Sequence, residues 1–107
     1  MKVSPEFLNF VMEKLLPIGD IRSRAMFGGY GIFHEGLMFS LNAEYTLYFK
    51  VNDSNRYIYE KAGSKPFPHG ISYWEVPTEV LEDNAKLHEW ANISITIAQE
   101  AAKKKQR

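Results

Sequence analysis

The sequence predicts a two-layer α+β domain in which helices cover one face of an antiparallel sheet of about five strands. Apolar residues recur at helical spacing near both ends of the chain, whereas they alternate with a period of two between Ile21 and Val51. The connections between the alternating segments are too short for the crossovers that parallel strands need. The expected order is helix, four strands, helix, strand, helix, which places the helices together on one face.

The first helix is expected over about residues 5–16. Ser4 is a good N-cap and Pro5 suits the first helical position, where its missing N–H costs nothing. Apolar side chains then follow at spacings of three and four until Pro17 and Gly19 end the run.

Four strands are expected next, at Ile21–Met26, Tyr30–His34, Leu37–Leu41 and Tyr45–Val51. Glu35-Gly36 is a two-residue hairpin signal, and Asn42-Ala43-Glu44 is predicted to be a short loop. Each of these strands therefore pairs with the next one along the chain.

Three glycines, Gly28, Gly29 and Gly31, lie between the first two strands. Glycine tolerates positive φ and close backbone approach, so we interpret the run as a structural turn or bulge. An anion-binding nest is the alternative, but a phosphate loop opens a helix and this run opens a strand.

The second half predicts a short helix from Tyr57 to Ala62, a loop at residues 64–70 and a fifth strand at Ile71–Val76. The loop contains Pro-Phe-Pro, which we expect to pack its ring over the core; a contact patch of Lys65 and His69 beside Phe67 is the alternative. One helical turn follows at residues 77–82. Asp83 then caps a long helix with the apolar stripe Leu87, Trp90, Ala91, Ser94, Ile97, Ala98 and Ala101.

Strand alternation separates the two faces of the sheet. It places Ile21, Phe39, Leu47 and Phe49 toward the helices, and Arg22, Arg24, Ser40, Tyr48 and Lys50 on the opposite side. Because tyrosine and arginine are common at interfaces, the predicted interaction face consists of Arg22, Arg24, Tyr48, Lys50 and Tyr73.

Composition favours one cytoplasmic domain over residues 1–107 without a membrane span. The chain has 107 residues and no cysteine, which suits a reducing compartment. Four of the 13 positive side chains lie in the tail at residues 103–107, which leaves nine against 13 negative ones, a charge of −4, over residues 1–102. This acidic body argues against direct DNA binding, and the lysine run suits the negative end of a helix dipole.

The sequence contains no recognisable catalytic constellation. His34, His69 and His88 fall in three different predicted elements without metal-ligand spacing, and His34 and Glu35 are expected to point to opposite sides of a strand. No nucleophile elbow is present. We therefore expect no catalytic residue, no metal and no cofactor.

Several ordered motifs resemble the N-terminal domain of the TfoX/Sxy family of bacterial competence regulators. They are the runs at residues 24–33, 38–39 and 47–51, then Ala62–Phe67, Ser72–Pro77 and the stretch from Leu81 to Ala91. The resemblance implies an α/β domain with an antiparallel sheet. In longer members it also implies a second, C-terminal domain and a role in switching on DNA-uptake genes alongside a cyclic-AMP receptor protein.

Two functions follow as hypotheses. The first is a non-enzymatic regulatory domain that contacts another protein, with the transcription machinery as the class that the resemblance indicates. The second is a small-ligand or enzymatic domain in which Arg22, Arg24, Tyr48 and Lys50 hold an anion. Exposed strand edges and the long amphipathic helix also predict a homodimer.

Overall fold

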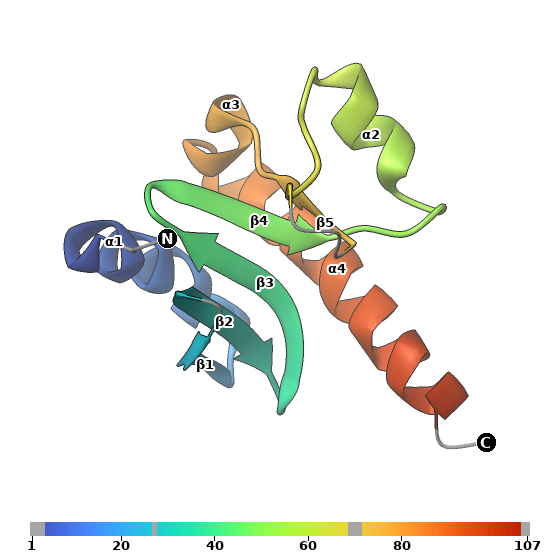
Figure 1. Cartoon of the computed structure of the whole chain (residues 1–107), viewed down its shortest axis with the longest axis horizontal. Coiled ribbons are helices and arrows are strands. Elements are labelled where there is room, and N and C mark those ends of the chain that lie inside the picture. The colour runs from blue at the N-terminus through green and yellow to red at the C-terminus, as the bar shows by residue number, and fades with distance from the viewer. Residues whose placement is uncertain (1–3, 27, 69–71, 106–107) are drawn as a thin grey trace.

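The computed structural model describes residues 4–26, 28–68 and 72–105. Within these residues, five strands form one antiparallel sheet in the order β1-β2-β3-β4-β5, with a long helix behind it (Figure 1). This is the fold class and the element order that the sequence predicts. The elements are α1 Pro5–Leu15, β1 Ile21–Met26, β2 Gly29–His34, β3 Leu37–Ala43, β4 Thr46–Lys50, α2 Arg56–Lys61, β5 Tyr73–Glu75, α3 Thr78–Leu81 and α4 Asn84–Lys105.

Local capping sets the start of both principal helices, as predicted. The Ser4 hydroxyl accepts a hydrogen bond from the Phe7 N–H at 3.3 Å, with proline at the first position of α1. Asp83 does the same for α4, because its carboxylate accepts from the Lys86 N–H at 3.1 Å. These bonds satisfy backbone donors that have no partner inside the helix.

The β2–β3 hairpin turns at Glu35 and Gly36, as its sequence predicts. Both residues have positive φ, 48° and 82°, which matches the twist of the flanking strands. The prediction of a loop at residues 42–44 is wrong in its extent. β3 continues through Ala43, so the loop begins later than predicted. Asn42 stays in the strand, fully buried, and its amide donates to the Thr46 carbonyl at 3.2 Å.

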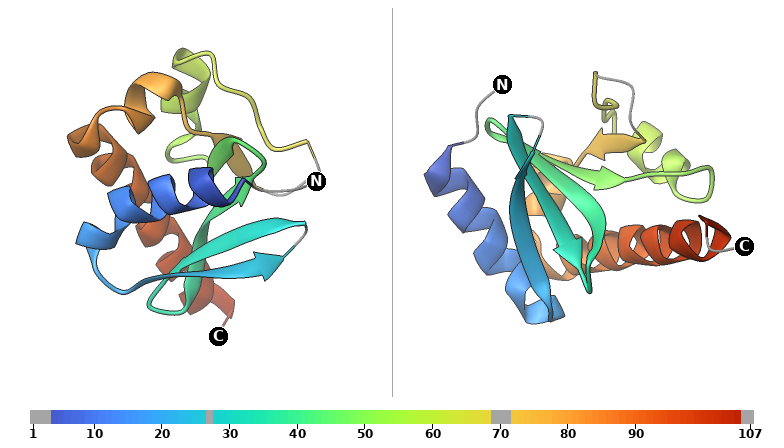
Figure 2. Two further views of the ribbon diagram at one scale, coloured as in Figure 1. Left: turned by 90° about the vertical axis from the view of Figure 1, so that its left-hand side faces the viewer. Right: turned by 60° about the horizontal axis from the view of Figure 1, so that its bottom comes forward.

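A β-bulge in β3 changes which side chains face the helices. Ile32 pairs with Ser40 and Phe33 with Met38, so Phe39 is the extra residue between them. The ribbon of β3 is curved (Figure 2). Ser40 pairs with Phe49 on the helix-covered face, and its hydroxyl donates to the Tyr48 carbonyl at 2.7 Å. The expectation that Ser40 lies on the opposite face is therefore wrong, because strict alternation ends at the bulge.

The main core lies between the sheet and the helices. It joins Val11 and Leu15 of α1 to the sheet and to α4, and the Tyr59 ring of α2 meets Trp90 of α4 edge-on at 4.7 Å. Five residues of the predicted α4 stripe are buried, namely Leu87, Ala91, Ser94, Ile97 and Ala98. Trp90 and Ala101 are half-buried, and Ile95, which the predicted stripe omits, is buried as well. None of the described helices is long and apolar enough to cross a membrane.

Candidate functional site

The strand register brings the five residues of the predicted interaction face onto one side of the sheet. Residues opposite each other in an antiparallel pair share a face. One row across the five strands runs Arg24, Gly31, Leu41, Tyr48 and Glu75. Arg22 pairs with Phe33 in β2, and Lys50 pairs with Tyr73 in β5, on the same side.

The tyrosines of this predicted face are covered by the protein itself. Phe67 packs edge-on against Tyr48 at 4.9 Å, and Tyr48 and Tyr73 are only 7% and 6% exposed. Burial raises the pKa of Tyr73 to about 12. The loop packs its ring over the sheet as its sequence predicts, so these tyrosines belong to a second small core with Leu41 and Ala43. His69 lies outside the described residues.

The arginines, in contrast, are exposed at the β1 end of the face. The Arg24 guanidinium lies over the Phe33 ring, 5.1 Å from its centroid. Arg22 is close to Asp20, 3.6 Å between Nε and Oδ1, with most of its side chain in solvent. Met26 pairs with Gly29 on the same side and is half-buried. We call Arg22, Arg24, Met26 and Phe33 the arginine patch. Its apolar members were not singled out from the sequence, although alternation places Phe33 beside the arginines.

Two glycines of the run leave little room for a side chain. A Cβ on Gly31 would lie 2.9 Å from the Met26 sulfur and 3.1 Å from the Phe33 ring. A Cβ on Gly29 would collide with the backbone carbonyl of Asn42. Gly28 has φ 76°, which a turn there requires. The role of the run as a structural turn stays a prediction.

The two edges of the sheet differ. The β5 edge is closed by the loop, because the Phe67 N–H donates to the Tyr73 carbonyl at 2.7 Å and the Glu75 N–H to the Lys65 carbonyl at 2.9 Å. In the described part of the chain, β1 pairs with β2 alone. Most of β1 is also exposed. The arginine patch thus lies beside a free strand edge.

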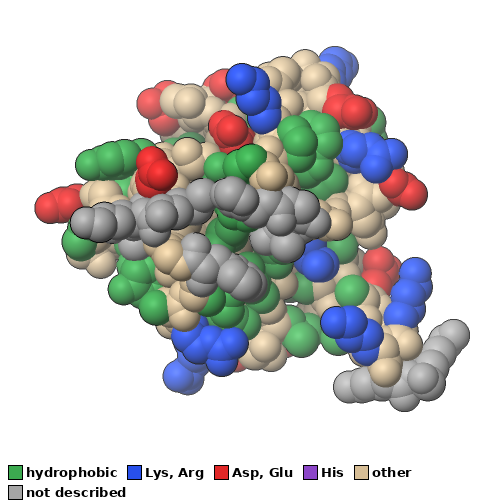
Figure 3. Space-filling model, viewed as in Figure 1, with side chains coloured by type: hydrophobic (Ala, Val, Ile, Leu, Met, Phe, Trp, Pro, Cys, Tyr) green, Lys and Arg blue, Asp and Glu red, His purple; other side chains and the backbone are tan. Residues whose placement is uncertain are grey.

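Lys50 lies apart from the arginines, so the four side chains do not converge on one anion. β1 and β4 are three strand spacings apart, roughly 14 Å. Lys50 lines a hollow together with Tyr73 and Lys105, and neither arginine is among the lining residues. Figure 3 shows the same separation, with one group of basic side chains over β1 and another over the C-terminal part of α4.

His34 and His88 are the histidines among the described residues, and they lie in separate contacts. The Nε2 atom of His88 is 2.7 Å from the Lys14 carbonyl, which ties α4 to α1. The prediction that His34 and Glu35 point to opposite sides of a strand is wrong. His34 Nδ1 and Glu35 Oε1 lie 3.9 Å apart, because Glu35 is in the turn, where strand alternation no longer applies. The described residues bring together no group of three histidine, cysteine, aspartate or glutamate side chains that is able to hold a metal ion.

Comparison with known proteins gives two matches. A family model described as the TfoX N-terminal domain matches residues 13–98. The DNA transformation protein TfoX1 of Aliivibrio fischeri is 34% identical over an alignment of 83 residues that covers 71% of this chain and 37% of that relative. The chain therefore spans little more than a third of the length of this relative.

Proposed function

The chain belongs to the family of the TfoX N-terminal domain, and on this premise we propose that it is a non-enzymatic protein-interaction domain in the regulation of DNA-transformation competence and transcription. The relative is named as a DNA transformation protein, which supports the process. The geometry supports the mode of action, because His34 and His88 lie in separate contacts while a mixed basic and apolar surface remains open.

The observation that carries this proposal is the free edge of β1 beside the arginine patch. An unpaired edge presents backbone donors and acceptors that another extended segment is able to pair with. Arg22 and Arg24 project from this strand on one face, with Met26 at its end. A strand added there would gain main-chain hydrogen bonds, and its side chains on that face would meet the arginines.

The charges select the kind of partner. If two copies paired through β1 in antiparallel register around Ser23, Arg22 of each copy would lie opposite Arg24 of the other. Like charges directly opposite each other destabilise a strand pair. An extended acidic segment of another protein fits this edge better. The homodimer stays a prediction for a surface other than β1, and a monomer mass by light scattering at micromolar concentration would contradict it.

A peptide of six residues that alternates glutamate and valine tests the edge directly, with a lysine-valine peptide as its charge-reversed control. Backbone NMR signals of β1 should shift on addition of the acidic peptide, and their amide exchange should slow. The double variant Arg22→Glu and Arg24→Glu should reverse the preference between the two peptides.

Lys65→Glu is the matched surface control, because Lys65 lies on the loop at the closed edge. It should bind the acidic peptide like the unmodified chain. Equal binding of both peptides, or changes confined to strands other than β1 and β2, would refute the assignment of this edge. A capture experiment from the host cell would then identify the natural partner through the same variants.

Direct DNA binding is not part of this proposal. Basic side chains lie in separate places on the face that Figure 3 shows, over β1, over the C-terminal part of α4 and near α2, rather than as one continuous basic face. Phosphate contacts supply most nonspecific affinity. DNA affinity that falls steeply with salt and disappears on removal of residues 103–107 would argue for DNA binding through the tail.

A further inference from the structure

A hollow of about 270 Å³ opens between the sheet and the last turns of α4. Leu37 and Met38 of β3 and Tyr73 of β5 form its apolar wall together with three alanines of α4. Lys50 and Lys105 supply its two charged side chains. The volume is just below the range of about 300–1,000 Å³ that is usual for small-molecule sites. Any ligand that fits the hollow is therefore small.

Two hydrogen bonds to its backbone carbonyl hold Lys50 in this position. Its carbonyl accepts a hydrogen bond from the Ser94 hydroxyl at 2.7 Å and another from the Asn55 amide at 3.3 Å. Its ammonium group lies 5.4 Å from the centroid of the Tyr73 ring. The Lys50 backbone is thus anchored to α4 and to Asn55, and its ammonium group lies beside the Tyr73 ring.

The positive charge at this site has no anionic partner in the described part of the chain. The ion pairs found there involve other residues, and neither Lys50 nor Lys105 takes part. Burial lowers the pKa of Lys50, and the nearby charge of Lys105 lowers it further. Both effects disfavour the charged form of Lys50, and a bound anion would offset them.

The position of a lysine at the end of α4 has a simpler explanation in the helix dipole, which favours cations at this end. That explanation covers Lys105 and its neighbours Lys103 and Lys104. It does not cover Lys50, which lies at the end of a strand. The convergence of a strand lysine and a helix lysine on one apolar hollow needs a reason of its own.

We propose that this hollow binds a small organic anion, with its charged group between Lys50 and Lys105 and its apolar part against Tyr73, Leu37 and the alanines of α4. Lysine contributes a compact charge that suits a carboxylate or a phosphate equally. The apolar wall distinguishes the ligand from inorganic phosphate. This site is independent of the β1 edge, so either proposal is able to fail without the other.

An NMR titration of the full chain with octanoate tests the site, with octanamide and inorganic phosphate as matched probes. Octanoate should shift the backbone signals of β3, β5 and the last turns of α4. Octanamide lacks the charge and phosphate lacks the tail, so each should bind at least about tenfold more weakly, which is about 1.4 kcal/mol. Equal binding of octanoate and octanamide would overturn the role of the lysines.

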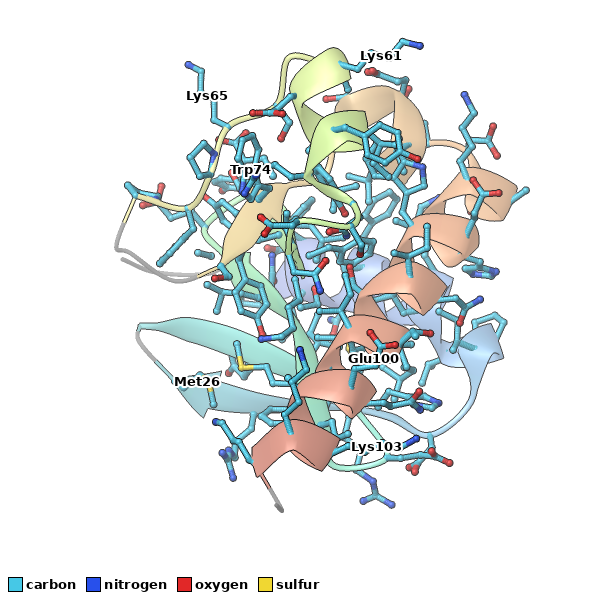
Figure 4. The ribbon with its side chains drawn as sticks, turned by 90° about the vertical axis from the view of Figure 1, so that its right-hand side faces the viewer. Met26, Lys61, Lys65, Trp74, Glu100 and Lys103 are labelled. Carbon is cyan, nitrogen blue, oxygen red and sulfur yellow. The ribbon has the colours of Figure 1, made fainter. Side chains whose placement is uncertain are left out.

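Two variants remove the charges one at a time. Lys50→Met and Lys105→Met keep most of the side-chain length, and each should weaken octanoate binding about tenfold. Lys105 is exposed, so its variant tests the site even if Lys50→Met is less stable. Lys65→Met is the control, since Lys65 lies far from Lys103 and the end of α4 (Figure 4). Octanoate binding that is unchanged in both site variants would refute the proposal.

Discussion

The Ser94 hydroxyl of α4 donates a hydrogen bond of 2.7 Å to the Lys50 carbonyl at the end of β4. This contact joins the long helix to the strand that carries a lysine of the proposed anion site. Ser94 is fully buried, so its hydroxyl depends on this acceptor rather than on water. The bond explains why a serine occupies the middle of an otherwise apolar helical stripe.

Ser94→Ala should lower the free energy of unfolding by about 1 kcal/mol, the usual net value of one such bond. The loss stays modest because the Asn55 amide continues to bond to the Lys50 carbonyl. Urea unfolding measures it, with the exposed Ser72→Ala as control. Two identical unfolding curves for Ser94→Ala and the unmodified chain would show that the contact adds nothing.

Gly29→Ala and Gly31→Ala should differ in stability although both lie in β2. The new methyl of Gly29→Ala meets the rigid backbone carbonyl of Asn42, so we expect a loss of about 1–3 kcal/mol. At Gly31 the neighbours include the flexible ends of Met26 and Met38, so the loss should be below about 1 kcal/mol. The urea unfolding midpoints of the two variants measure this difference. A larger loss of stability in Gly31→Ala than in Gly29→Ala would contradict this packing.

Stability should fall as the pH rises above about 10. The pKa of Tyr73 is raised to about 12 in the folded chain, whereas an unfolded tyrosine titrates near 10. Between these values the unfolded state binds fewer protons, so the free energy of unfolding decreases by up to about 1.4 kcal/mol per pH unit for this group.

Tyr73→Phe should therefore reduce this slope when unfolding is measured at pH 9, 10 and 11. It should not abolish the slope, because burial also raises the pKa of Tyr48 and Tyr59. A slope that Tyr73→Phe leaves unchanged would show that Tyr73 titrates normally in the folded chain.

Phe67→Ala should uncover the second core. Loss of a buried phenylalanine usually costs about 3–5 kcal/mol, and the ring of Phe67 is only 6% exposed. The pKa of Tyr73 should also move down toward 10, because water would reach its ring. Ultraviolet titration of the tyrosines measures this shift; a pKa that stays near 12 in the variant would show that Phe67 does not shield Tyr73.

The sequence by itself determined the class of fold, the order of the elements and several of their ends. These depend on preferences of a few neighbouring residues: the cap at Ser4, the cap at Asp83 and the positive φ of Glu35-Gly36. It also placed Arg22 and Arg24 on the correct face, because β1 lies before the bulge and alternates strictly.

Only the tertiary structure decided which parts of that face are open. The bulge at Phe39 turned Ser40 toward the helices, and Phe67, distant along the chain, covered Tyr48. Lys50 and Lys105 likewise line the same hollow although they lie 55 positions apart, one on a strand and the other at the end of a helix. Such contacts arise from packing between segments far apart in the chain, which local spacing and propensity do not encode.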